Sequence, residues 1–243
     1  MTLILAAALA AAAPQAAPAP ASCPADLTAP AYVCRALQAE KAGRNAEGAD
    51  AFEKAAAQTP ASDPAQARMW AAAGNLWIAA SQPAKAAAAL DHALSGDALK
   101  AEQHGLALLD RARAAEMTGD LKTARAKVGE AARTISEDPY LWFFSAALAI
   151  REDDIPTAKA AINRALAMVP DSPEVMFEAG HVAQAAGETA KAREYWTKTV
   201  AADPRGPAGR AAREALAMSD VPLTVTHQVA TRPDGDGEGP KDK

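Results

Sequence analysis

The sequence of 243 residues predicts an all-α fold: a right-handed superhelical solenoid of about five helix-turn-helix repeats that ends in a capping helix. Three observations predict it. Alanine, the best helix former, makes up more than a quarter of the residues and only 5% are aromatic, which favours closely packed helices over a sheet. A pattern of small and large apolar residues recurs at a nearly constant interval along the chain. Glycine and proline recur where the predicted helices end.

The first element that we expect is a signal peptide over residues 1–21. Residues 3–13 form an uncharged apolar run, too short for a membrane span of about 20 residues, and Ala19, Pro20 and Ala21 form a small-residue cleavage site. No Lys or Arg precedes the run, so a disordered leader on a cytoplasmic protein is the alternative. The favoured interpretation is a periplasmic or secreted bacterial protein without a transmembrane span.

Residues 22–28 form an N-terminal extension that carries Cys23, and Cys34 is the only other cysteine. One pair near the mature N-terminus predicts a disulfide in an oxidising compartment, which would stabilise the fold by about 2.5–3 kcal/mol in the chain-entropy model. The spacing matches no metal motif. A lipid anchor through Cys23 is the less favoured alternative, because no Leu stands three residues before it.

The repeats fill residues 29–218 together with the capping helix, and they begin near residues 29, 67, 105, 139 and 173. The clearest unit, Pro173 to Gly206, contains Ala179, Gly180, Ala183, Gly187, Ala192, Trp196 and Pro204. The unit that precedes it contains Trp142, Ala146, Ala149, Ala158, Ile162, Ala165 and Pro170. A small residue at the crossing of two helices lets their backbones approach, and large residues fill the gap beside it.

The three earlier units repeat the same pattern. They contain Leu108, Ala112, Ala115, Gly119, Ala124 and Val128; Trp70, Gly74, Trp77, Ala86 and Leu90; and Tyr32, Ala36, Ala39, Gly43, Gly48 and Phe52. The first two units are longer than the later ones by about one helical turn. We place this excess in their closing loops.

This pattern resembles the tetratricopeptide repeat, in which a Trp, a small residue and a Tyr on the first helix are followed by an Ala, a Phe and a closing Pro on the second. The resemblance covers roughly Ala29 to Pro204, although Arg35 and Arg111 stand where Leu is usual. It implies a solenoid whose first helices line a concave face that holds an extended or helical peptide. Residues 205–218 would be the polar-faced cap that a solenoid needs, with Ala211, Ala215 and Met218 on one side of the helix and Arg210, Arg213 and Glu214 opposite. Residues 219–243, rich in Pro, Gly and charge, are predicted to be disordered, after a short alternating run at 221–225.

Carried over by repeat register, the concave face predicts a partner-binding groove. Its residues are Arg68, Asn75, Leu106, Leu109, Arg113, Tyr140, Phe143, Arg151, Phe177 and His181, with Ala71 and Glu174 beside them. Apolar side chains mixed with arginines would suit an apolar segment that carries some acidic residues. The alternative is that the aromatic residues pack between neighbouring repeats.

No motif for catalysis, a metal or a cofactor is present, so we expect neither an enzyme nor a cofactor-binding protein. The four histidines have no metal-ligand spacing. A net charge of −5 without a basic stripe argues against nucleic-acid binding.

Two functions remain after these exclusions. The first is an exported scaffold of the bacterial cell envelope that binds a protein or peptide partner. The second is a non-catalytic subunit or regulator of an envelope enzyme complex, which would act through self-association or docking of its whole surface, and a homo-oligomer is possible.

Overall fold

The computed structural model describes residues 22–219 of the chain. The predicted signal peptide and the alternating run at 221–225 lie outside the described residues. So does the predicted tail except for Ser219, which is the last residue of a helix. Within residues 22–219 the regular structure is entirely α-helical, as expected from the alanine-rich sequence.

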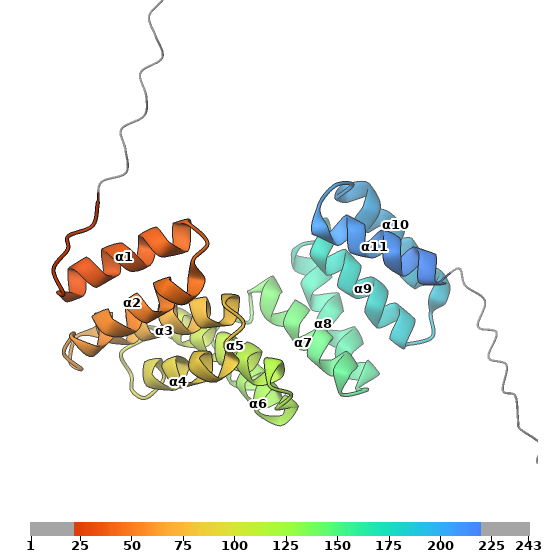
Figure 1. The fold of residues 1–243 in the computed structure, drawn as a ribbon. Coiled ribbons are helices and arrows are strands. Elements are labelled where there is room, and N and C mark those ends of the chain that lie inside the picture. The colour runs from red at the N-terminus through yellow and green to blue at the C-terminus, as the bar shows by residue number, and fades with distance from the viewer. Residues whose placement is uncertain (1–21, 220–243) are drawn as a thin grey trace, which may run out of the picture. The chain divides into compact units, whose positions relative to one another are not determined.

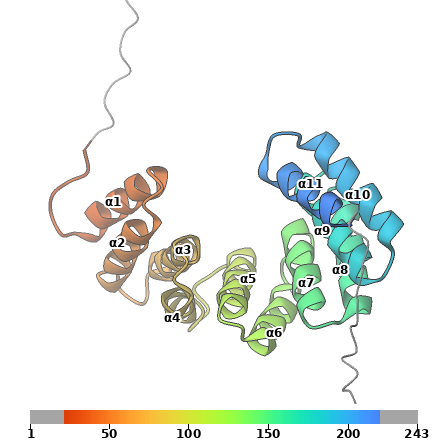
Figure 2. The same cartoon turned by 45° about the vertical axis from the view of Figure 1, so that its right-hand side comes forward.

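The chain divides after Ile135 into two compact units, which we call the N-terminal unit and the C-terminal unit. The N-terminal unit contains α1 (Ala29–Lys41), α2 (Asn45–Ala57), α3 (Pro64–Ala79), α4 (Pro83–Ala93), α5 (Ala101–Met117) and α6 (Leu121–Ala131). The C-terminal unit contains α7 (Pro139–Arg151), α8 (Ile155–Met168), α9 (Pro173–Ala185), α10 (Thr189–Ala202) and α11 (Pro207–Ser219). In each unit consecutive helices form antiparallel pairs, one pair for each predicted repeat (Figures 1 and 2).

The first helix of every repeat ends in a left-handed residue at the same repeat position. Gly43, Gly119 and Gly187 have φ values of 71°, 80° and 76°, as the sequence predicts for glycine at a helix end. In the other two repeats this position holds Ser81 and Asp153, each with a φ of 57°. The turn therefore keeps its geometry even where glycine is absent.

The crossing of the two helices within a repeat is as tight as the small residues predict. A Cβ atom added to Gly74 would lie 2.4 Å from Leu90, and one added to Gly180 would lie 2.2 Å from the indole nitrogen of Trp196. Their counterparts in the other repeats are buried alanines: Ala36, Ala112 and Ala146. Large buried side chains fill the same position on every second helix: Phe52, Leu90, Val128, Ile162 and Trp196.

The additional residues of the first two repeats lie partly in helices. The helices α3 and α5 begin at Pro64 and Ala101, ahead of the predicted starts at 67 and 105. Asp63 caps α3 by accepting a hydrogen bond from the Ala65 N–H at 2.8 Å, with Pro64 at the first helical position. Part of the excess thus forms an additional first turn of α3 and α5, and the closing loops are shorter than expected. The prediction that the whole excess lies in the closing loops is therefore wrong.

The last helix, α11, packs as a cap, but its buried face only partly matches the predicted one: Ala215 is buried as expected, whereas Met218 is not. Its buried residues are Ala208, Gly209, Ala212 and Ala215, whereas Met218 is 72% exposed. The Asp203 carboxylate fixes the start of the helix, because it accepts hydrogen bonds from the backbone N–H groups of Gly206 and Gly209 at 2.8 and 3.2 Å. Arg210, Arg213 and Glu214 are exposed, in agreement with a polar outer face.

Candidate protein-binding surfaces

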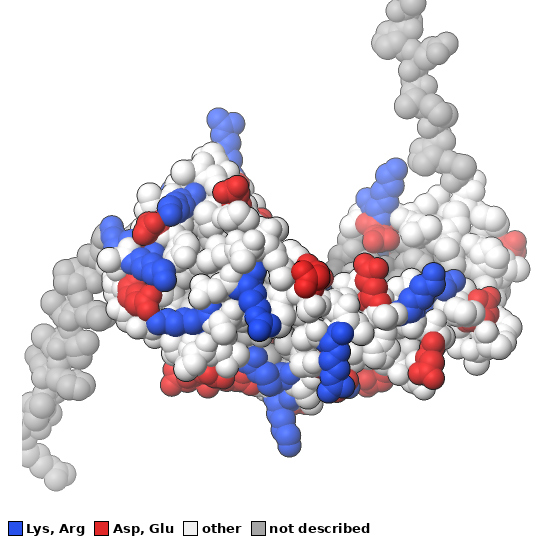
Figure 3. Space-filling model, turned by 180° about the vertical axis from the view of Figure 1, so that it is seen from behind, with Lys and Arg blue, Asp and Glu red and all other residues white. Residues whose placement is uncertain are grey.

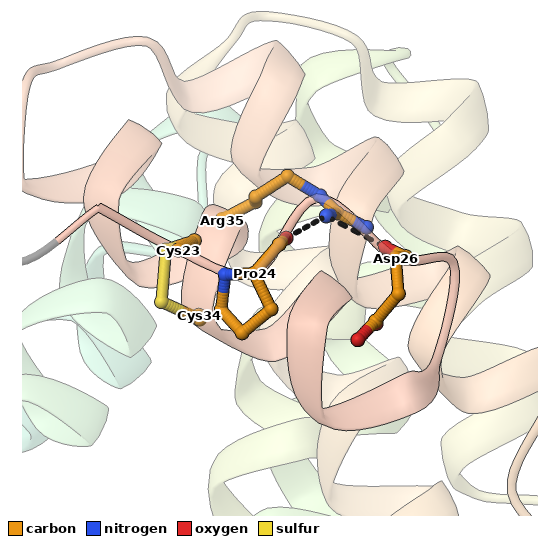
Figure 4. Close-up of a disulfide and its surroundings, with 5 residues drawn as sticks. All are labelled: Cys23, Pro24, Asp26, Cys34 and Arg35. Carbon is orange, nitrogen blue, oxygen red and sulfur yellow. Dashed lines mark hydrogen bonds between the residues drawn. A yellow bond between two sulfur atoms is a disulfide. The ribbon is translucent and has the colours of Figure 1, made fainter.

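The disulfide Cys23–Cys34 ties the N-terminal extension to α1 (Figure 4). Arg35, the next residue on the helix, reaches over this extension. Its Nη1 donates hydrogen bonds to the carbonyl oxygens of Pro24 at 2.7 Å and Asp26 at 2.9 Å. Its guanidinium also lies 4.4 Å from the centroid of the Tyr32 ring. An arginine where the repeat usually has leucine therefore holds the extension in place.

Arg111 occupies the same repeat position in α5 and has a comparable role. Its Nε donates a hydrogen bond to the carboxylate of Asp91 on α4 at 2.8 Å. The Arg111 side chain is mostly buried while that of Asp91 is largely exposed. The two departures from the repeat pattern thus connect a first helix to the segment that precedes it in the stack.

The residues of the predicted groove fall in both units. Arg68, Asn75, Leu106, Leu109 and Arg113 belong to α3 and α5 of the N-terminal unit. Tyr140, Phe143, Arg151, Phe177 and His181 belong to α7 and α9 of the C-terminal unit.

In the N-terminal unit a cavity of about 250 Å³ opens between α3 and α5. Ala71, Leu99, Leu106 and Ala107 give it an apolar lining, and Arg68, Gln103 and Asp110 supply polar groups. Leu106 is 43% exposed, whereas Leu109 is only 2% exposed and belongs to the core. Of these two residues of the predicted groove, Leu106 is therefore accessible to a ligand and Leu109 is not.

One side of this cavity is held by a polar network that the sequence did not reveal. The Asp110 carboxylate accepts a hydrogen bond from the Asn75 amide at 2.9 Å and one from the Arg113 guanidinium at 2.9 Å. Asn75 and Arg113 were predicted for the groove, but Asp110 between them was not. The only available signal was the i, i+3 spacing of Asp110 and Arg113, which is common on helix surfaces.

Arg68 has a different environment from Arg113. It is exposed at the cavity, and no hydrogen bond or ion pair is recorded for it among residues 22–219. Its positive charge is therefore available to a ligand of the cavity, while the charges of Asp110 and Arg113 offset each other.

The predicted aromatic residues of the C-terminal unit lie partly between repeats. The rings of Tyr140 and Phe143 stack with centroids 5.6 Å apart. Tyr140 is 41% exposed, but Phe143 packs against a core cluster that contains Val175 and Ala179 of the next repeat. Phe177 likewise packs against a cluster that reaches α11.

His181 connects Phe177 to the core of the last repeat. Its ring centroid lies 4.4 Å from that of Phe177 and 5.7 Å from that of Trp196. Its Nδ1 lies 3.5 Å from the Glu178 carboxylate, which is mostly buried. Arg151, by contrast, is exposed at the end of α7. The Phe143 and Phe177 rings are thus partly inter-repeat packing, which was the alternative to a groove.

Charged side chains of both signs are interspersed on the face shown in Figure 3, with uncharged areas between them. Residues 22–219 contain no group of three His, Cys, Asp or Glu side chains placed to hold a metal ion. Within the same range, no helix has the length and apolar character that a membrane crossing requires.

Several solved structures have similar folds. PilW, described as a widely conserved type IV pilus biogenesis factor, matches with a TM-score of 0.64 and 18% identity over 74% of this chain and 80% of its own. YrrB, described as a TPR protein with an unusual peptide-binding site, matches with a TM-score of 0.56 and 16% identity over 76% and 92% of the two chains. BtubC from P. vanneervenii matches with a TM-score of 0.59 and 17% identity over 88% and 86%. No family model and no curated protein matches the sequence.

The stacked helix pairs with a small residue at each crossing define a helical-repeat protein. Its fold is that of the tetratricopeptide-repeat proteins, as the residue pattern predicted and the similar structures show.

Proposed function

We propose that this protein is a non-catalytic scaffold that binds a protein partner in the cavity between α3 and α5. The observation that carries the proposal is the combination of an exposed Leu106, an apolar lining and an exposed Arg68 that forms no hydrogen bond or ion pair with residues 22–219. This combination suits an apolar side chain of the partner with an acidic residue close to it.

The side chains around the cavity favour binding of one kind of partner residue over a general attraction to charged proteins. The Asp110 carboxylate is already engaged by Asn75 and Arg113, so it holds the α5 side of the cavity in one arrangement. Polar groups fixed before binding lose little conformational entropy when a ligand arrives. Arg68 then remains as the charged group that can select an acidic partner residue.

We also propose that the protein acts outside the cytoplasm, in the cell envelope. The disulfide and the apolar run within residues 1–21 both support export. Cys23 is in a disulfide, and a bonded thiol cannot also carry a lipid, which argues against the lipid-anchored alternative. The similarity to PilW, itself described as a pilus biogenesis factor, is compatible with an envelope protein.

The binding proposal is tested by a photo-crosslinking amino acid placed at Leu106 of the full chain in intact cells. The same amino acid at Ala126, which is exposed on α6, is the matched control. We expect one crosslinked partner from position 106 and not from 126, with the crosslinked peptide carrying Asp or Glu near an apolar residue.

Two substitutions of Arg68 test whether its positive charge is required for partner binding. Arg68→Glu should abolish the position-106 crosslink, whereas Arg68→Lys should retain most of it. A product that survives Arg68→Glu, or that forms equally from position 126, would contradict the proposal.

A further inference from the structure

A second open surface lies at the N-terminal end of the N-terminal unit, away from the α3–α5 cavity. A cavity of about 420 Å³ opens there between α1 and α2. Its lining includes Arg35, Gln38 and Ala39 of α1, Arg44 at the N-cap of α2, and Glu47 and Ala51 of α2.

The C-terminal unit contains the same cavity with an additional wall. Its lining includes Ala179, Val182, Ala183, Glu188, Lys191 and Tyr195, which hold the same repeat positions, in the same order, as the six residues above. There α8, the second helix of the preceding repeat, contributes Lys159, Ile162 and Asn163, and the volume is only about 90 Å³. The larger N-terminal cavity therefore lies where the second helix of a preceding repeat would pack, and residues 22–219 contain no helix at that place.

The charges at this position indicate the helix that would fit. In the C-terminal unit Lys159 of α8 forms an ion pair with Glu188, and its hydrogen bond lowers the pKa of Glu188. Arg44 stands in place of Glu188 and Glu47 in place of Lys191, and the Arg44–Glu47 ion pair at 2.8 Å has the reversed signs of the Glu188–Lys191 pair. With this reversal, the residue in the position of Lys159 would be acidic. Arg35 corresponds to Arg111, whose partner on the preceding helix is Asp91. Both positions therefore require an acidic side chain.

The spacing of these two acidic residues follows from the repeat register. The repeat of Lys159 starts at 139, and the repeat of Asp91 starts at 67. Relative to these starts, Asp91 lies one helical turn further along its second helix than Lys159 does. The two requirements are thus at positions i and i+4, on one face of a helix. Position i+3 of this helix, one residue before the second acidic position, holds Ile162 in one repeat and Leu90 in the other. We therefore expect an apolar residue at i+3.

One of the guanidinium nitrogens of Arg35 lacks an acceptor. Its Nη1 binds the carbonyl oxygens of Pro24 and Asp26, but its Nη2 is buried without a hydrogen-bond partner. Leaving a buried donor unpaired is unfavourable, so the Arg35 side chain would gain by turning this nitrogen toward a carboxylate placed as Asp91 is placed beside Arg111. Residues 1–21 contain no Asp or Glu, so they do not have the chemistry that this position requires.

We propose that the cavity between α1 and α2 is a docking site for a helix of a partner protein that carries acidic residues at positions i and i+4 and an apolar residue at i+3. The helix would pack on α1 and α2 as α8 packs on α9 and α10, with its carboxylates opposite Arg44 and Arg35. This surface is independent of the α3–α5 cavity.

The test uses a peptide built from the helix that fills the equivalent position. It carries residues 155–168 with Lys159→Glu and Asn163→Glu, and a side-chain staple across positions 160 and 164, which are exposed in α8, because an isolated helix of this length is marginal in water. The control peptide keeps Lys159 and Asn163. We expect the full chain to bind the acidic peptide roughly tenfold more tightly in a fluorescence-anisotropy titration, since two exposed ion pairs are gained.

Substitutions in the protein test whether the peptide binds in the cavity between α1 and α2. Arg44→Glu should reverse the preference in favour of the control peptide, because it restores the sign of the Glu188–Lys159 pair. Arg205→Glu, the same charge change in an exposed loop of the C-terminal unit, and Leu106→Asp, in the α3–α5 cavity, should leave the preference unchanged. Equal binding of the two peptides, or no effect of Arg44→Glu, would overturn the proposal. So would a dimer of the chain that Arg44→Glu dissociates, because the occupant would then be a second copy.

Discussion

At the scale of single residues, the arginines at positions 35 and 111 show how a departure from a repeat pattern becomes understandable in three dimensions. A leucine at this position would pack between helices, whereas each arginine extends to an acceptor outside its own helix. Arg111 reaches a carboxylate and Arg35 reaches backbone carbonyls. The sequence shows that the leucine is missing, but the partner of Arg35 depends on the path of a segment without regular structure, which no periodicity predicts.

Two of the repeat positions that the predicted groove combined differ in their surroundings. The residues at the second position, Arg68, Leu106 and Tyr140, are exposed. At the fifth position Leu109 is buried, and Phe143 and Phe177 are half-buried against clusters that include residues of the neighbouring helices. Both positions lie on one helical face in sequence, and only the packing of successive repeats separates them. Register therefore places these residues on one helical face, but it does not tell which of their side chains are exposed.

The first prediction concerns Phe143 and Phe177. Because each ring packs against a core cluster, we expect Phe143→Ala and Phe177→Ala each to lower the free energy of unfolding by about 1–3 kcal/mol, less than the loss for a fully buried ring. Urea denaturation followed by circular dichroism measures it.

Tyr140→Ala is the matched control, since Tyr140 is 41% exposed and its removal should change the free energy of unfolding by no more than about 0.5 kcal/mol. If the phenylalanine variants were as stable as the Tyr140 variant, the rings would be groove residues and not inter-repeat packing.

At the scale of the helices, the features that depend on one or two residues, such as the turns and the helix crossings, were predicted correctly from the sequence. The glycines at the turns and the small residues at the crossings have the roles that their positions indicated. The additional first turns of α3 and α5 were not predicted, since the repeat pattern begins only after them. The cap α11 was expected as a helix, but its buried face was misjudged because alanines occur on several of its sides.

The second prediction tests the crossing of α9 and α10. Gly180→Ala would place a Cβ atom 2.2 Å from the Trp196 ring, so the helices must separate or the ring must shift. We expect a loss of about 1–3 kcal/mol in the free energy of unfolding, the usual range for overpacking. Thermal or urea unfolding of the full chain measures it.

Gly129→Ala provides the control for the change from glycine to alanine. Gly129 lies within α6, and a Cβ atom there would meet nothing within 4 Å. This variant should gain about 0.5–1 kcal/mol from helix propensity alone. A stabilising effect at both glycines would contradict the close approach of α9 to α10.

At the scale of the whole molecule, the sequence indicated one continuous repeat domain over residues 29–218, whereas the structure divides after Ile135 into two compact units. The repeat pattern passes through this boundary without interruption, and the starts at 105 and 139 are separated by the same interval as those at 139 and 173. A regular period is therefore no guide to where a chain of repeats separates into units.

The third prediction uses this division. Replacing both Cys23 and Cys34 by Ser should lower the stability of the N-terminal unit by about 2.5–3 kcal/mol, because the extension is no longer tied to α1. Hydrogen exchange read by mass spectrometry should show the lost protection in α1 and α2, with α7 to α11 unchanged. Faster exchange across both units would mean that they unfold as one.

The vacant helix position beside α1 also bears on how such a molecule could be enlarged. Because the residues around it repeat those that receive α8, a further helix pair fused ahead of Ala29 would find its contacts already in place, provided that its second helix is acidic where Arg35 and Arg44 require it. The short extension tied down by the disulfide does not close the first repeat in the way that α11 closes the last one. An array of this kind can therefore be lengthened at its first repeat without redesigning the surface that receives the addition.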